Sequence, residues 1–83
     1  MEQKYHPSLS EAVSAFQKGD ILTASNLLKR FLNDSDLALK AQANNFMSLI
    51  YLDKQQYPKA ILCFGTASSI SDYYMYWRNL WAI

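Results

Sequence analysis

The segments GDILTASNLL (residues 19–28) and QQYPKAILCF (residues 55–64) decide the fold of this chain, because the second repeats the pattern of the first 36 residues later. In each segment an alanine, Ala24 or Ala60, is followed four residues later by a large apolar residue. Positions four apart lie on one face of a helix, so the alanine allows close approach of a paired helix and the larger side chain fills the space beside it. A spacing of about 20 to 50 residues is typical of helical hairpins that stack on one another.

Helix-end signals extend this pattern toward the N-terminus. Ser8-Leu9-Ser10-Glu11 has the form of a capping box, which predicts a first helix starting at Ser8. Gly19 is expected to end that helix as a C-cap, and Asp20 to start the second as its N-cap. The polar run Asn33–Asp36 predicts a loop that ends in a further N-cap.

The same signals predict three more helices in the second half. The longest is expected over Leu37–Lys54, and Pro58 is placed where a first helical turn tolerates it. Pro58 thus begins a fourth helix, which contains Gly65. A glycine inside a helix lowers its stability by up to about 1 kcal/mol relative to alanine, so we expect another group to pack closely against Gly65. Ser71 or Asp72 is expected to cap a fifth helix. No segment alternates with a period of two, so we expect five helices and no sheet.

Composition limits the class of protein. The 83 residues are enough for one domain, and 51% apolar residues with 18% charged residues exclude a disordered chain. A net charge of +1 gives no basic excess for nucleic acid. The densest apolar run, residues 46–52, is too short for a membrane span, which needs about 20 residues. The N-terminus has no secretory signal pattern, and one cysteine excludes an internal disulfide, so we expect a cytoplasmic protein.

Residues for catalysis are lacking in the sequence. Cys63 stands among apolar helix positions, 57 residues from the single histidine, His6, so a structural role is expected. One cysteine and one histidine cannot form a closed zinc site. The two glycines, Gly19 and Gly65, form no phosphate-binding loop. We therefore expect neither an enzyme nor a cofactor or metal site.

Seven positions within residues 41–74 match a known repeat pattern: Met47, Ser48, Tyr51, Tyr57, Ala60, Phe64 and Ala67. At these positions the chain resembles the tetratricopeptide repeat (TPR) family. The resemblance implies an all-α, right-handed stack of antiparallel helical hairpins in a single domain over residues 1–83. The first repeat would span residues 5–38, the second 41–74, and a partial third 75–83. The first repeat matches only on its second helix, and an irregular helical bundle is the alternative.

The resemblance also implies an interaction module, because repeats of this family line a groove that holds a peptide or a partner helix. The residues predicted to contact an amphipathic partner helix are Leu9, Val13, Phe16, Asn45, Leu49, Leu52 and Arg78. For the first three, a core role is an equally weighted alternative. In one branch of the family, very small repeat proteins hold the needle subunit of bacterial type III secretion in an apolar groove. This chain is similar to them in its small size, low charge and apolar groove residues, so the resemblance implies a needle-subunit co-chaperone as the most specific prediction.

The C-terminal segment is unusually aromatic, with five of the twelve aromatic residues between Tyr73 and Trp81. Exposed aromatic side chains are favoured anchors of protein interfaces. We therefore add four residues to the predicted contact sites: Tyr73, Tyr76, Trp77 and Trp81. Either a hetero-complex or a homodimer would satisfy this prediction. The alternative function is a structural or oligomerising subunit, or the N-terminal part of a longer repeat scaffold.

Overall fold

The computed structural model describes the backbone of residues 6–82 and the side chains of residues 6–72. Over this part every secondary-structure element is a helix. The elements are a short 3₁₀ helix η1 (Pro7–Leu9) and four α-helices: α1 (Ser10–Gln17), α2 (Ile21–Lys29), α3 (Leu37–Asp53) and α4 (Tyr57–Ala82). The all-α prediction is confirmed, whereas the expected number of five helices is wrong, because α4 continues through Ser71 and Asp72 without a break.

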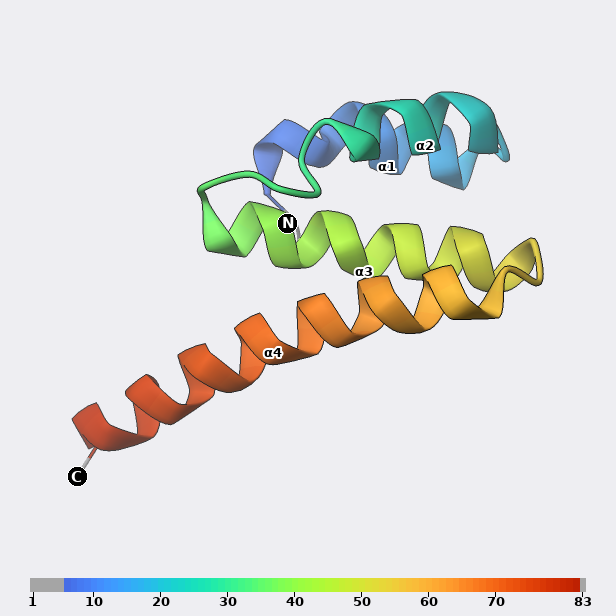
Figure 1. The fold of residues 1–83 in the computed structure, drawn as a ribbon. Coiled ribbons are helices and arrows are strands. Elements are labelled where there is room, and N and C mark those ends of the chain that lie inside the picture. The colour runs from blue at the N-terminus through green and yellow to red at the C-terminus, as the bar shows by residue number, and fades with distance from the viewer. Residues whose placement is uncertain (1–5, 83) are drawn as a thin grey trace.

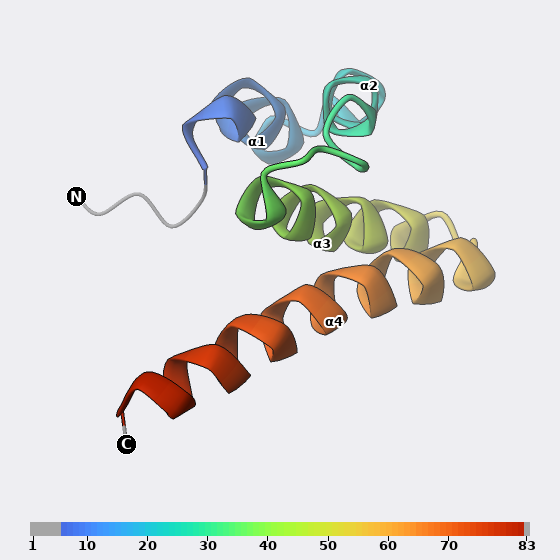
Figure 2. The same cartoon turned by 60° about the vertical axis from the view of Figure 1, so that its left-hand side comes forward.

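The helices form three tiers (Figure 1). Helices α1 and α2 make an antiparallel pair, α3 packs beneath this pair, and α4 runs antiparallel to α3 on the side away from α1 and α2 (Figure 2). Since α3 has 17 residues and α4 has 26, α4 extends about 14 Å beyond α3. The radius of gyration, 13.5 Å, is accordingly larger than the about 12 Å expected for a compact domain of this length.

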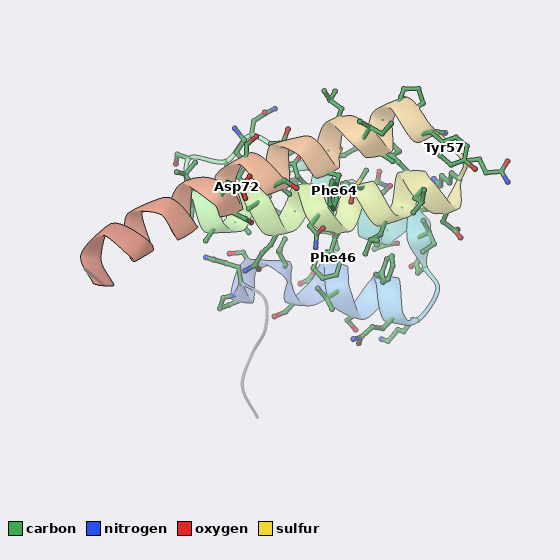
Figure 3. The ribbon with its side chains drawn as sticks, turned by 90° about the horizontal axis from the view of Figure 1, so that it is seen from below. Phe46, Tyr57, Phe64 and Asp72 are labelled. Carbon is green, nitrogen blue, oxygen red and sulfur yellow. The ribbon has the colours of Figure 1, made fainter. Side chains whose placement is uncertain are left out.

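The hydrophobic core lies between the α1–α2 pair and α3. Its largest fully buried side chains are Leu9, Leu28, Met47 and Ile50. Phe16 of α1 packs edge-on against Phe46 of α3, with ring centroids 6.1 Å apart. Figure 3 shows Phe46 directed from α3 toward α1. One apolar stripe of α3 is therefore buried in the core that α3 shares with the first hairpin.

The turn between α1 and α2 is set by Gly19, which has a φ of +83°. The Gly19 N–H donates to the Phe16 carbonyl (3.1 Å), and the Asp20 N–H donates to the Ala15 carbonyl (2.9 Å). These two bonds form a Schellman motif, which satisfies carbonyls at the end of α1. A positive φ favours glycine because it has no Cβ.

The turn between α3 and α4 has the same geometry 36 residues later. Gln55 has a φ of +60°. Its N–H donates to the Leu52 carbonyl (3.0 Å), and the Gln56 N–H donates to the Tyr51 carbonyl (2.8 Å). The two segments quoted at the outset therefore occupy equivalent positions in two helical hairpins.

Two of the four predicted N-caps are confirmed and two are wrong, one of the latter being the Ser71 or Asp72 cap of the absent fifth helix. The Asp20 side chain accepts from the Thr23 N–H at the start of α2, and the Asp36 side chain accepts from two N–H groups at the start of α3. The capping box at Ser8 does not form: α1 begins at Ser10, and its N-cap, Leu9, makes no side-chain cap. Ser8 lies instead in η1, because Pro7 starts that short helix with φ already set.

His6 caps η1 and fastens it to α3. Its Nδ1 accepts from the Ser8 N–H (3.1 Å), while its Nε2 lies 3.3 Å from a carboxylate oxygen of Asp36. A neutral imidazole with its hydrogen on Nε2 satisfies both contacts. The His6 backbone N–H also donates to the Gln42 side chain. These bonds fix the entry of the chain into the fold.

The missing break in α4 has a local cause. Before α3, the Asp34 carboxylate accepts from the Asp36 N–H (2.8 Å), which shapes the loop that separates α2 from α3. The residues 36 positions after Asn33 and Asp34 are Ser69 and Ile70. Isoleucine has no oxygen with which to form such a turn, so the helix continues.

Candidate partner-binding groove

An apolar groove of about 290 Å³ lies between α3 and α4. Its lining consists of three residues from each helix: Ser48, Leu49, Leu52, Ala60, Ile61 and Phe64. The small side chains of Ser48 and Ala60 are buried at its floor. The four large side chains remain exposed, by 45% at Leu49, 53% at Leu52, 71% at Ile61 and 59% at Phe64.

Helical spacing brings these side chains together. Ser48 and Leu52 are four residues apart on α3, as are Ala60 and Phe64 on α4, so each pair lies on one face of its helix. The Ser48 hydroxyl donates to the Asn45 carbonyl of its own helix (2.6 Å), which satisfies its polar group internally. The groove therefore presents an almost wholly apolar surface.

A second, more polar groove adjoins the first along the same two helices. It measures about 310 Å³, and Phe64 lines both grooves. Its polar lining includes Gln42 and Asn45 of α3 and Asp72 of α4. Figure 3 shows Phe64 on α4 between Tyr57, at the start of the helix, and Asp72. Together the two grooves make one surface that is apolar near the α3–α4 turn and polar near the start of α3.

Three of the predicted contact residues lie on this surface. Leu49 and Leu52 line the apolar groove, and Asn45 is exposed in the polar one. Leu9 and Val13 do not: they are 0% and 4% exposed, so the prediction that they face a groove is wrong.

The reason is the packing of the first hairpin. The apolar stripe of α1 is covered by α2 and α3, which leaves no free face there. Phe16 is partly buried against the same core. Of the two interpretations of these three residues, the structure favours a core role.

Five further predicted contact residues belong to the last turns of α4: Tyr73, Tyr76, Trp77, Arg78 and Trp81. Their backbone is helical, but their side chains lie outside the part of the chain that the structure describes. Their role as contacts stays a prediction.

None of the α4 residues that line the apolar groove was predicted from the sequence to contact a partner. Phe64 is expected from the repeat pattern to fill space beside a paired helix, yet it is mostly exposed, as is the neighbouring Ile61. The available signal was the repeat itself, because the apolar face of a repeated hairpin is covered only where another helix packs on it. The expectation that a group packs against Gly65 is also wrong, since a Cβ there would have no neighbour within 4 Å.

The described residues contain little reactive chemistry. Burial raises the pKa of the Cys63 thiol, which lowers its thiolate fraction at neutral pH. Residues 6–72 hold no cluster of three or more metal-ligating side chains. Among the helices described, none combines the length and apolarity needed to cross a membrane.

No family model, curated protein or solved structure matches the chain. Functional inference therefore rests on the groove between α3 and α4.

Proposed function

We propose that this protein is a protein–protein interaction module, a small chaperone or adaptor that holds an amphipathic helix of a partner in the α3–α4 groove. The observation that carries the proposal is the set of four large apolar side chains, Leu49, Leu52, Ile61 and Phe64, exposed side by side along two helices. Scattered exposed apolar residues need no explanation, but a contiguous patch in a groove is typical of an interaction site.

A helix suits this groove better than an extended peptide. An extended strand gains its affinity from backbone hydrogen bonds to a sheet edge, and residues 6–82 contain no strand. The backbone groups within α3 and α4 are already paired inside each helix. Binding must then rely on side-chain burial, which an amphipathic helix supplies through one apolar stripe.

The equivalent turns at Gly19 and Gln55 support the repeat interpretation behind this proposal. Its narrowest form is a cytoplasmic co-chaperone for the needle subunit of type III secretion, which rests on the TPR resemblance alone. The alternative is an oligomerising or scaffold subunit. The length of α4 beyond α3 favours this alternative, because that part of the helix has no α3 beside it.

The proposal is tested with a fluorescently labelled amphipathic model helix of leucine, lysine and glutamate. Fluorescence anisotropy should show saturable binding to the intact chain and its loss in the Phe64→Asp variant. Leu22→Asp is the matched control, because Leu22 is 70% exposed on α2, outside the groove. Absence of binding, or equal losses in both variants, would contradict groove binding. Light scattering of the unliganded chain separates a monomer from the oligomerising alternative.

A further inference from the structure

The six residues of the apolar groove each have a counterpart 36 positions earlier in the first hairpin. The counterparts of Ser48, Leu49, Leu52, Ala60, Ile61 and Phe64 are, in that order, Ala12, Val13, Phe16, Ala24, Ser25 and Leu28. Five of these counterparts are at most 6% exposed, and the sixth, Phe16, is partly buried against the core. The open groove of the second hairpin is thus the same surface that is covered in the first.

Helix α3 is the element that covers this surface in the first hairpin. It contributes four buried apolar side chains to the core: Leu39, Ala43, Met47 and Ile50. Phe46 adds the edge-on contact with Phe16. Ala43, which is 0% exposed, is small enough to let the helices approach closely. The molecule therefore contains a bound example of the helix that fits this type of surface.

We infer that the α3–α4 groove binds a partner helix with the residue pattern of α3. That pattern is a large apolar residue, an alanine four positions later, and further large apolar residues four and seven positions after the alanine. The inference rests on the proposed function and adds the recognition pattern of the partner. The spacing follows from Leu39, Ala43, Met47 and Ile50, which form one helical stripe.

The differences between the two surfaces indicate how the partner departs from α3. Small residues are retained at the floor, where Ser48 and Ala60 replace Ala12 and Ala24. Leu9, in the core, is replaced by the exposed Asn45. An amide that becomes covered by a partner requires a hydrogen bond, so the partner helix carries a polar group at the end that faces Asn45.

Among the described residues no segment of this chain can be the occupant, so we assign the groove to a different protein. In a second copy, α3 is already buried in its own core and cannot be offered without unfolding. The segment 36 residues after α3 begins at Tyr73, but its backbone up to Ala82 continues α4. That segment also has Asn79 where α3 has Ala43. Neither source supplies a free helix with the required pattern.

The experiment uses a synthetic, labelled peptide of residues 36–54 as the probe and the intact chain as its receptor. We expect saturable binding by fluorescence anisotropy, weakened about tenfold or more by Phe64→Asp in the receptor and unchanged by Leu22→Asp. A peptide with Ala43→Trp should also bind about tenfold more weakly, because the bulky ring prevents close approach. Circular dichroism checks that each receptor variant is folded.

Three results would overturn the inferred recognition pattern without by themselves contradicting the proposed function. Equal binding of the leucine–lysine–glutamate model helix and the 36–54 peptide would show groove binding without the pattern. Peptide binding that is insensitive to Phe64→Asp would mean that the peptide replaces the resident α3. A dimer that dissociates on Phe64→Asp would identify a second copy as the occupant. If neither peptide binds, both the inference and the proposed function fail.

Discussion

The two helical hairpins are built on one local pattern but have different surroundings. Both turn at a residue of positive φ, Gly19 or Gln55, and both bury the following alanine, Ala24 or Ala60. Yet Leu28 in the first hairpin is 1% exposed, whereas its counterpart Phe64 is 59% exposed. Local pattern therefore sets where helices turn and pair, while burial depends on whether another helix packs across the hairpin.

The largest change in stability is expected when the two equivalent side chains, Leu28 and Phe64, are truncated. Leu28→Ala should lower the free energy of unfolding by about 2–5 kcal/mol, because it leaves a cavity in the core. Phe64→Ala should cost less than about 1 kcal/mol, because the ring is mostly in water already. Urea denaturation followed by circular dichroism measures both. Equal losses would mean that Phe64 is covered in solution.

Exchanging the connector tests why only the first hairpin is followed by a loop. The double variant Ser69→Asn, Ile70→Asp restores the Asn-Asp-Ser-Asp sequence found before α3. We expect α4 to break near Asp72 and the free energy of unfolding to fall by about 1–2 kcal/mol, since Ile70 is partly buried. NMR chemical shifts report the break, and Ser69→Ala, which keeps Ile70, is the control. A continuous helix in the double variant would refute the assigned cause.

The turn residues can be exchanged to test their equivalence. Gly19→Gln should destabilise the fold by about 1 kcal/mol, because a side chain is strained at positive φ. Gln55→Gly should stabilise it by about 0.5 kcal/mol for the same reason, less the backbone entropy that glycine adds to the unfolded chain. Thermal unfolding measures the pair. Changes of the same sign at both sites would show that the turns differ.

An effect no larger than that at the turns is expected in the exposed middle of α4. Gly65→Ala should stabilise the protein by up to about 1 kcal/mol, because the helix gains propensity and the new Cβ meets no neighbour within 4 Å. The same variant tests whether the groove still binds its ligand when α4 is more rigid. We expect binding of the model helix to be retained. A destabilised Gly65→Ala variant would indicate a close neighbour on this face.

Much of the helical framework was predictable from sequence, because its determinants lie within a few residues of each helix end. The caps at Asp20 and Asp36 and the C-cap at Gly19 form as predicted. The prediction of a capping box at Ser8 was wrong because Pro7 starts a 3₁₀ helix, and the N-cap of that helix is His6. The prediction of a fifth helix was wrong because it relied on the capping residue Asp72 alone. The residues before Asp72 do not form the turn that a loop requires.

The candidate site was only half predictable. Leu49 and Leu52 were identified through the register of a family resemblance, and both are exposed in the groove. The same register placed Leu9 and Val13 on the surface, where they are not. Ile61 and Phe64 were missed because an apolar helix face has the same appearance in sequence whether or not another helix covers it.

The sequence by itself determined the helical class, the positions of the connections between α1 and α4 and the 36-residue equivalence of the hairpins, since periodicity and capping act over one or two helical turns. Only the tertiary structure decided which of two equivalent apolar faces is core and which is open. Burial depends on contacts between distant segments: α3 packs on the first hairpin, whereas α4 continues straight past the place where the next such helix would begin.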